Sequence, residues 1–254
     1  MTGNGRVSWL DDRAAVDLGT ARIRLIGFGH PSIVDEPSGV PGSARPVRHG
    51  LVADVAACAR LVDQVLRTAL PEGARTPGRV LVGVPVTASP AERATVTGIV
   101  ERAAGCAATV VEEPLAAALG SGLDITGPRP RLLMDVGAGI IEAVVIRDAA
   151  VTDAVAVQLP ADGDGSLPAH VQDRVTEMAA ELLARLPARL RPAAREGGLM
   201  LTGGGAAEAG LAGRLCSRLR MTVSSAPEPA HATVRGLARL CLPPMAALLA
   251  LPTA

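Results

Sequence analysis

The chain has 254 residues, and its 25 acidic side chains are balanced by 25 arginines, because it contains no lysine. A formal net charge of zero leaves no basic field to hold nucleic acid through its phosphates, and one Phe, one Trp and no Tyr leave almost no rings to stack on bases. Nucleic-acid binding is therefore excluded, and the core must be built from Ala, Val and Leu with closely packed backbones.

The N-terminal quarter begins without a targeting signal. Residues 1–12 lack the apolar core of a signal peptide, and no apolar run in the chain reaches the about 20 residues that span a bilayer, so we expect a cytoplasmic protein. Residues 13–29, RAAVDLGTARIRLIGFG, alternate around a DLGT turn and predict a hairpin. Residues 30–50 are rich in Pro, Gly and Ser and predict a connecting loop with little structure of its own.

The next segments alternate between helix and strand. Apolar residues at helical spacing predict a helix within residues 51–70, and RVLVGVPV at 79–86 predicts a buried strand. Ser89, with Pro90 and Glu92 behind it, predicts the start of a second helix. Residues 107–123 predict a short strand, an acidic corner and an Ala-rich helix that ends at glycine. The apolar positions of the first helix are Val52, Val55, Ala56, Ala59, Val62 and Leu66.

After TGPRPR the pattern starts again, so the chain has two similar halves. Each half opens with a strand, a glycine turn that contains Asp, and a second strand. The predicted elements of the second half are strands at 131–137, 140–146 and 150–159, a long helix from about Leu167 to Leu186, a strand, triple-glycine loop and helix within 198–219, and a helix within 228–241.

Three glycine turns, DLGT, DVGAG and TGGGA, stand out. Glycine turns bind phosphate because several main-chain N–H groups can converge on an anion where no β-carbon intervenes. Each turn alone is typical of an ordinary tight turn. Three of them, two with an Asp at a strand end and spread over two similar halves, predict a phosphate site between the halves.

Neither the cysteines nor the histidines show the spacing of a metal or redox site. We expect the cysteines to be small buried side chains. The cysteines are Cys58, Cys106, Cys216 and Cys241, and the histidines are His30, His49, His170 and His231.

Segments that follow one another in the same order resemble those of the bacterial actins MreB and Mbl. They are VDLGTARIRL, VLVGVPVTASPAERATV, VVEEPLAAALGSGLDI, RLLMDVGAGIIEAVVI and LMLTGGGA, with RPVRHGLVAD and EPAHATVRGLA also similar. The resemblance implies the α/β actin-like ATPase fold, with two similar lobes of mixed sheet plus helices around a central cleft. Residues 1–125 would form the first lobe, with helices in 236–254 packing back on it, and residues 131–235 the second.

The resemblance also implies which residues would hold ATP and Mg²⁺. Asp17 and Asp135 would face the metal, an ion that keeps its waters and takes few carboxylates. Glu113 would help to activate the attacking water, although Glu112 and Glu113 are also typical of a charged corner at a helix N-terminus. The residues that would approach the nucleotide are Gly19, Thr20, Ala21, Arg22, Gly137, Ala138, Gly139, Gly203, Gly204, Gly205 and Ala206.

Among the substitutions that depart from the family pattern in these loops, three bear on nucleotide binding or hydrolysis. Where the family has DIGGGTTE, the chain has DVGAGIIE, and Ile140 can neither donate nor accept a hydrogen bond to orient water. Ala138 adds a methyl group where backbone would approach phosphate. Arg22 replaces the asparagine of DLGTAN, and either clamps phosphates or lies solvated on a strand edge. We expect impaired hydrolysis, with ATP and Mg²⁺ bound weakly or not at all.

The chain also has no room for the small subdomain that MreB inserts in each lobe. Residues 30–50 stand in place of the first and PADGDGSL, at 160–167, in place of the second. In the family these insertions supply part of the adenine pocket and filament contacts. The loop EGARTPG, at 72–78, lacks the apolar pair that reaches the membrane, and Trp9 with Leu10 would give only weak anchoring, so direct membrane binding is not expected.

The hypothesis is a reduced MreB/Mbl-like actin homologue, which acts in cell shape or cell-wall assembly as a scaffold or modulator. Its partners would be full-length MreB/Mbl-type filaments or cell-wall synthesis proteins, with self-association left open and recruitment to the membrane through partners. Two alternatives remain: a slow ATPase that uses Glu113, Asp17 and Asp135, and an interaction module that binds no nucleotide.

Overall fold

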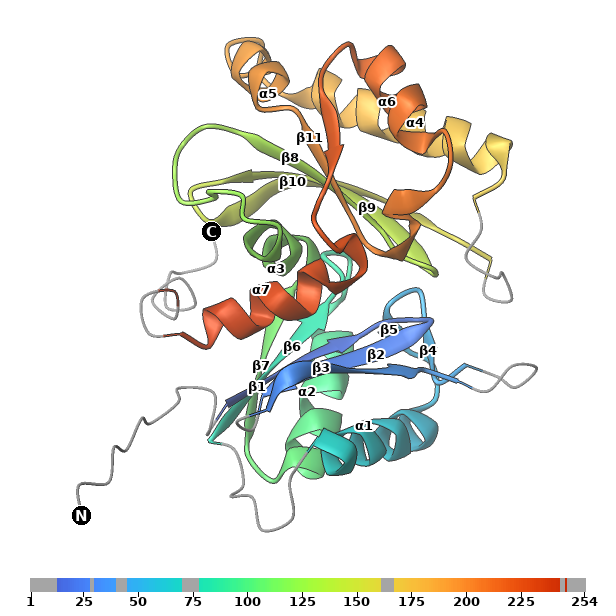
Figure 1. The fold of residues 1–254 in the computed structure, drawn as a ribbon, viewed down its shortest axis with the longest axis vertical. Coiled ribbons are helices and arrows are strands. Elements are labelled where there is room, and N and C mark those ends of the chain that lie inside the picture. Colours follow the sequence, from blue (N-terminus) through green and yellow to red (C-terminus); the bar gives the residue numbers. More distant parts are fainter. Residues whose placement is uncertain are drawn as a thin grey trace.

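In the computed structural model, the described residues are 13–27, 30–39, 45–69, 78–160, 167–242 and 245. They form two lobes, each built on a five-stranded sheet with helices against it (Figure 1). Expectations about Trp9 and Leu10, most of the loop at 72–78, most of PADGDGSL and the end of the chain from 246 lie outside the described residues. None of the helices within these ranges is long and apolar enough to cross a membrane.

The first lobe follows the predicted order of strand, turn and strand. Its elements are β1 (Arg13–Leu18), β2 (Arg22–Gly27), β3 (His30–Pro37), β4 (Val47–Arg48), β5 (Leu51–Val52), α1 (Val55–Ala69), β6 (Arg79–Val84), α2 (Pro90–Ala104), β7 (Ala107–Glu112) and α3 (Glu113–Gly120). The large sheet has the order β3-β2-β1-β6-β7, in which β1 is antiparallel to β2 and parallel to β6. As predicted, α2 begins with a capping box, in which Ser89 and Glu92 satisfy each other's main-chain N–H groups.

The second lobe repeats this design. Its elements are β8 (Arg131–Val136), β9 (Ile140–Arg147), β10 (Ala150–Gln158), α4 (Ala169–Arg185), α5 (Arg191–Gly197), β11 (Leu199–Thr202), the 3₁₀ turn η1 (Gly204–Ala207), α6 (Leu211–Leu219), β12 (Val223–Ser225) and the 3₁₀ turn η2 (Pro229–His231). The helix that follows, α7 (Ala232–Leu240), packs against β1, β2 and β6 of the first sheet. The sheet order is β10-β9-β8-β11-β12, with β8 antiparallel to β9 and parallel to β11. The prediction of two similar halves is confirmed.

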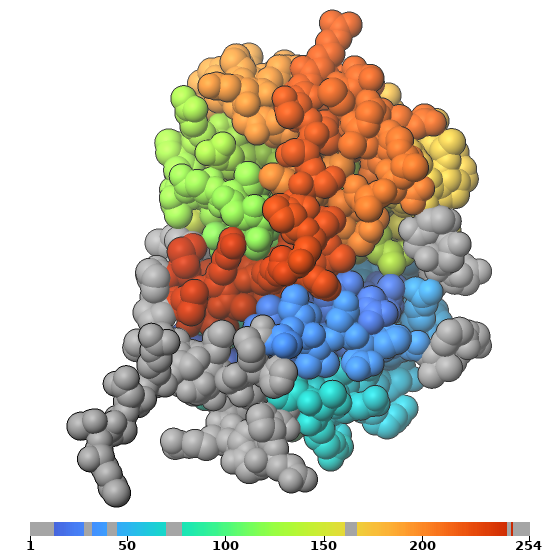
Figure 2. Space-filling view, in the orientation of Figure 1, coloured from blue at the N-terminus to red at the C-terminus, as the bar shows by residue number. Residues whose placement is uncertain are grey.

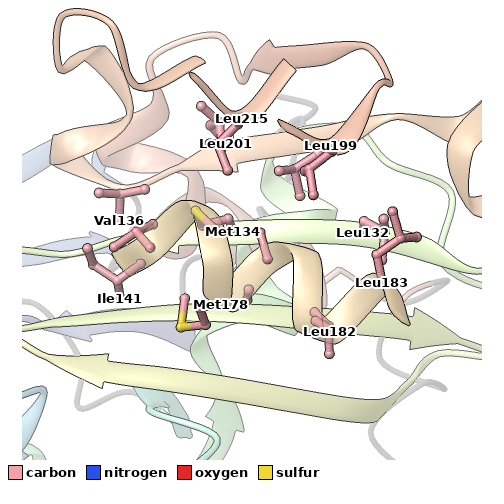
Figure 3. Close-up of a cluster of buried hydrophobic side chains, with 14 of the residues drawn as sticks. Leu132, Met134, Val136, Ile141, Met178, Leu182, Leu183, Leu199, Leu201 and Leu215 are labelled. Carbon is pink, nitrogen blue, oxygen red and sulfur yellow. The ribbon is translucent and has the colours of Figure 1, made fainter. Parts of the chain in front are cut away.

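Each lobe has its own core, and both are aliphatic. In the second lobe, side chains of β8 and β9 such as Met134 and Ile141 meet Met178 and Leu182 of α4, as Figure 3 shows, while Leu201 and others close the cluster from β11 and α6. Within the described residues, the buried clusters contain aliphatic side chains, Met and Cys but no ring. This agrees with the expectation from composition.

The two lobes are joined by α3 and α7, which lie against each other between the sheets (Figure 1). A third buried cluster includes Ala117 of α3 and Leu237 of α7 together with Leu81 of the first sheet and Leu133 of the second. The helices approach very closely, because a β-carbon on Gly120 would overlap the carbonyl oxygen of Ala232, and one on Gly236 would overlap that of Ala116. Backbone contact therefore replaces the large side chains that this chain lacks.

Two predictions about local structure are wrong. Residues 30–50 are not a simple loop, because they contain β3, which pairs with β2, and β4. β3 is an edge strand, where a proline such as Pro37 is tolerated because one side of the strand has no ladder partner. The cysteines are not uniformly buried: Cys58 and Cys241 are buried, Cys106 is half-buried and Cys216 is exposed on α6.

The face of α1 was also predicted only in part. Val62 and Leu66 are buried as expected, but Val52 lies in β5 and Val55, at the first turn, is exposed. α5 and β12 were not predicted.

Replacing Gly236 with Ala should destabilise the fold, because the added methyl group has no space at the α3–α7 crossing. Overpacking of this kind costs about 1–3 kcal/mol and occasionally more. The measurement is the free energy of unfolding from urea titration followed by circular dichroism. Gly213→Ala on α6 is the matched control, since nothing lies within 4 Å of its added carbon, and it should stabilise by about 0.5–1 kcal/mol. Equal effects of the two substitutions would contradict this account of the crossing.

Candidate functional site

A cavity of about 290 Å³ lies where the turns of the two lobes face each other. On the face seen in Figure 2, the orange segment that leads into α7 lies against the blue strands of the first lobe, and His231 there reaches Asp35 of β3, with 3.3 Å between Nε2 and Oδ2. The cavity is lined by Asp17, Gly19, Thr20, Ala21, Arg22, Arg24, Gly50, Glu113, Asp135, Gly137, Ala138, Gly139, Ile140, Gly203, Gly204, Gly205, Glu208, Ala230 and Thr233.

Most of the residues predicted for the site are therefore brought together. The exception is Ala206, which packs in the core of the second lobe and does not line the cavity. Sequence reasoning missed Arg24, Gly50, Glu208, Ala230 and Thr233, which also line it. Of these, Arg24, Gly50, Ala230 and Thr233 lie in the segments VDLGTARIRL, RPVRHGLVAD and EPAHATVRGLA that resemble the family, whereas Glu208 lies outside them.

The first two glycine turns have the same geometry. In one, the N–H of Gly19 donates to the carbonyl of Arg22 at 3.1 Å, and in the other the N–H of Gly137 donates to that of Ile140 at 3.0 Å. A β-carbon would come within 2.8 Å of the acceptor oxygen at Gly19 and 2.7 Å at Gly137. Glycine is thus needed at the equivalent position of the two turns, one in each lobe.

The third turn, after β11, begins at Gly203, whose φ of +82° favours glycine. A β-carbon there would lie 2.5 Å from the carbonyl oxygen of Val136, at the end of β8. By contrast, nothing lies within 4 Å of the β-carbon position of Gly204. The turn is therefore pressed against β8 on one side and open on the other.

The lobes touch directly at the second turn. Gly139 packs against Thr20 and the main chain of His49, and a β-carbon on it would overlap the Thr20 hydroxyl. His49 Nδ1 lies 2.8 Å from the carbonyl oxygen of Gly139, and because a carbonyl only accepts, Nδ1 carries the proton and donates. Thr20 Oγ1 in turn accepts a hydrogen bond of 2.9 Å from the N–H of Gly50. These contacts hold the two predicted phosphate turns at a fixed separation.

Three buried carboxylates line the cavity: Asp17, Asp135 and Glu113. Burial raises the pKa of Asp17; the positive charge of Arg24 lowers this pKa, and the negative charge of Asp135 raises it further. Burial also raises the pKa of Asp135, while a hydrogen bond of 2.9 Å from the hydroxyl of Thr202 lowers it. The pKa of Glu113 lies well above its ordinary value because of burial and the neighbouring Asp17, and Glu113 Oε1 has no hydrogen-bond partner among the described residues.

Two arginines of β2 reach the same region, in different ways. Arg22 bonds to Asp35, with 2.6 Å between Nε and Oδ1, and its side chain is 42% exposed. Arg24 is only 14% exposed and places Nη1 at 3.3 Å from Asp17 Oδ2. The residue that contacts the predicted metal ligand is therefore Arg24, while Arg22 lines the cavity from its more exposed side.

These surroundings fit a magnesium ion poorly. One predicted ligand, Asp17, already carries a guanidinium, and the other, Asp135, accepts a hydrogen bond from Thr202. Within the described part of the chain, no group of three or more His, Cys, Asp or Glu side chains is arranged to hold a metal. A divalent cation at Asp17 would have to displace a positive charge, which costs Coulomb energy in a buried site.

Glu142 of β9 links the lobes behind the cavity. It is 1% exposed, and Oε1 accepts a hydrogen bond of 2.9 Å from the N–H of Val86, which follows β6. Burial raises its pKa to about 8; Asp135 and Glu112 add to the rise, while N–H groups of Val86 and Thr87 oppose it. Glu112 itself pairs with Arg93 at 3.2 Å. At neutral pH this contact between the lobes is therefore made by the largely protonated carboxyl of Glu142.

A separate cavity of about 310 Å³ lies between α4, α5 and α6, away from the turns. Its arginines already serve the fold: Arg191 donates to the carbonyl of Leu186, and Arg218 pairs with Glu177. None of the predicted site residues lies there, so the cavity between the lobes remains the candidate site.

Comparison with known proteins agrees with this geometry. The MreB/Mbl protein family model matches residues 42–166. The cell shape-determining protein MreB of Escherichia coli K12 is 27% identical over 163 residues, which cover 52% of this chain and 47% of that protein. The cell shape-determining protein Mbl of Bacillus subtilis 168 is 22% identical over 162 residues, covering 64% and 49%. The chain is an MreB-like protein. It spans about half the length of these curated relatives.

Solved structures show that this MreB-like chain has the actin fold. MreB5 of Spiroplasma citri bound to AMPPNP superposes with a TM-score of 0.79 at 16% identity, over 90% of this chain and 95% of that one. The MamK double helical filament gives a TM-score of 0.75 at 17% identity, over 91% and 100%. The predicted α/β fold of two lobes around a central cleft is confirmed.

The stability of this MreB-like chain should fall as the pH rises from about 4.5 to about 8, because the folded state keeps a proton on Glu142 that the unfolded chain releases. Glu142→Gln, which resembles the protonated carboxyl, should remove part of this decline. Its melting temperature should match the parent at pH 5 and exceed it at pH 8.5, as measured by calorimetry.

The control is Glu177→Gln, an exposed glutamate whose pKa is lowered by its hydrogen bond with Arg218. This substitution should leave the decline between pH 5 and 8.5 in place. A Glu142→Gln variant with the same pH dependence as the parent would refute the role given to this carboxyl.

Proposed function

We propose that this MreB-like chain binds the phosphates of ATP in the cavity between its lobes, weakly, and acts in cell shape or cell-wall assembly as a scaffold or modulator. The observation that carries the proposal is the meeting of all three glycine turns around one cavity, at the ends of β1, β8 and β11. The actin-fold neighbour MreB5 has been solved with AMPPNP and with ADP, and the matched curated relatives are named as cell shape-determining proteins.

The size of the cavity supports weak binding. About 290 Å³ lies at the lower end of the range of about 300–1,000 Å³ that is usual for small-molecule sites. Ala138 adds a methyl group to the lining. A nucleotide would thus be held through its phosphates more than through its base.

The residues around the cavity also support binding without efficient hydrolysis. Ile140 lines the cavity where the family resemblance implies a threonine, and its alkyl group cannot position water. Glu113 is the implied catalytic residue, but its raised pKa favours the neutral acid, which cannot accept a proton from water. Loss of such general-base help costs about 10²–10⁴ in rate.

We further propose the organisation and setting that go with this function. Residues 1–125 and 131–235 form the two lobes, with the chain after 236 returning to the first lobe, where α7 contacts β1. The chain works in the cytoplasm and meets the membrane only through partners, which are MreB/Mbl-type filaments or cell-wall synthesis proteins.

Calorimetric titration with AMPPNP should detect binding, and Asp135→Ala should abolish it, because Asp135, the last residue but one of β8, accepts the hydrogen bond from Thr202 of β11 that holds the second and third turns together. Phosphate release from ATP by the parent should stay at the background rate. The control is Asp153→Ala, a half-buried aspartate on β10 that pairs with Arg185 away from the cavity, and it should bind like the parent.

Other outcomes decide between the alternatives. Phosphate release that disappears in Glu113→Gln would show that the chain is a slow ATPase. Absence of binding, in a parent with a cooperative melting transition, would leave a nucleotide-free interaction module.

Self-association is a second testable part of the proposal. The MamK neighbour forms a double helical filament, and the chain superposes on the whole of its length. We expect this chain to sediment as assemblies at high concentration, more so with AMPPNP, because nucleotide between the lobes would favour one closed arrangement. A monomer under all conditions in analytical ultracentrifugation would restrict the role to binding other filaments.

A further inference from the structure

The charged side chains of the first sheet form a row across three strands. Asp17 of β1 lies opposite Arg24 of β2, and Arg24 lies opposite Asp35 of β3 in the strand register. Residues that face each other across neighbouring strands lie on the same side of a sheet, so the strand register makes the three side chains neighbours. The row ends at the cavity, which Asp17 and Arg24 line.

Arg24 is fixed in this row from both sides. Nη1 lies 3.3 Å from Asp17 Oδ2, and Nε lies 3.3 Å from Asp35 Oδ2. Asp35 is held in turn by Arg22 and by His231 of η2. Arg24 lines the cavity, and its buried Nε has no hydrogen-bond partner among the described residues, so the hydrogen-bonding capacity of the guanidinium is not saturated.

The position of Arg24 is the one at which a cation would be expected in this fold. Its Nη1 contacts Asp17, and Asp135, the second carboxylate that the family resemblance assigns to the metal, lines the same cavity. A guanidinium offers planar donors that match phosphate oxygens, and unlike a metal ion it needs no set of coordinating ligands. Arg24 therefore supplies, in covalently attached form, the positive charge that lies between the carboxylates and a bound phosphate.

We propose that the Arg24 guanidinium takes the place of the divalent cation beside Asp17, so that the cavity binds nucleoside polyphosphates without Mg²⁺. This inference rests on the proposed function, namely that phosphates bind between the lobes. It adds that metal and arginine compete for the same place. Mg²⁺ is thus not required by the parent chain and becomes useful only when Arg24 is removed.

The test is calorimetric titration of the full chain with AMPPNP, once in EDTA and once with excess Mg²⁺. For the parent, the two dissociation constants should agree within about threefold. Arg24→Met should weaken binding by at least about tenfold in EDTA, since a charge-assisted contact is lost, and Mg²⁺ should restore it. Arg185→Met is the matched control, an arginine paired with Asp153 on the surface of the second lobe, and it should behave like the parent.

A second variant keeps the test valid if Arg24→Met does not fold, which melting curves would reveal. Asp17→Asn preserves the shape of the side chain and releases Arg24 from its carboxylate. Binding in EDTA should then be retained or strengthened. If Asp17 were a metal ligand, the same change would weaken binding in Mg²⁺.

The failures are distinguishable. A parent that binds AMPPNP only with Mg²⁺ would overturn the role of Arg24 and leave the proposed function intact. A folded parent that binds under neither condition would overturn both. Arg24→Met that binds in EDTA like the parent would also refute the inference.

Discussion

Two glycines allow α3 and α7 to cross with their backbones in contact, and the relative position of the lobes depends on this crossing. Gly120 and Gly236 each face a carbonyl oxygen of the opposite helix. Around them lie alanines such as Ala116 and Ala117, together with side chains from both sheets. A chain with almost no rings cannot fill a wide gap between two sheets, so it brings the helix axes together and buries small side chains at high density. The close crossing of the two helices thus compensates for the scarcity of aromatic side chains.

The crossing matters for the cavity because the strand ends are fixed relative to it. Glu113, at the first position of α3, lines the cavity, and Thr233, near the start of α7, does so from the other helix. A change in the crossing would therefore move Glu113 relative to the turns at Gly19 and Gly137. Further contacts, from His49 to Gly139 and from Val86 to Glu142, then set the distance between the lobes at the cavity itself.

Much of the fold could be predicted from the sequence, because the signals were local. The capping box at Ser89 and the glycine turns depend on a few consecutive residues, and the repeated strand, turn and strand pattern revealed the two halves. β3 could not be predicted in this way. Its prolines and polar residues are typical of a loop, and only its place at the sheet edge, with Val34 packed on the core and Asp35 paired with two arginines, makes it a strand.

The site shows the same division between local and distant information. Gly19, Thr20, Gly137 and Gly203 were predicted because they lie in turns whose sequences are distinctive. Arg24 was not predicted as a site residue, because the sequence around it shows only one polar position of an alternating strand. Its role follows from register: β1 and β3 each place an aspartate opposite it. Ala206 was predicted with them but packs in the core, since the loop sequence does not tell at which residue the chain turns back into the core.

Ile140 and Arg24 lead to one physical conclusion when they are considered together. Hydrolysis of a phosphoanhydride needs a positioned water and a group that accepts its proton, whereas binding needs only donors and positive charge. Ile140 removes a polar group from the place where water would be positioned, and the buried Glu113 favours its neutral form. Arg24, by contrast, adds permanent positive charge, which arginine keeps at any physiological pH. In the proposed function, the two residues therefore act on different terms: Ile140 would lower the rate of the chemical step, and Arg24 would preserve attraction for phosphate. Under the proposal, a cleft with both residues would retain a nucleotide rather than turn it over.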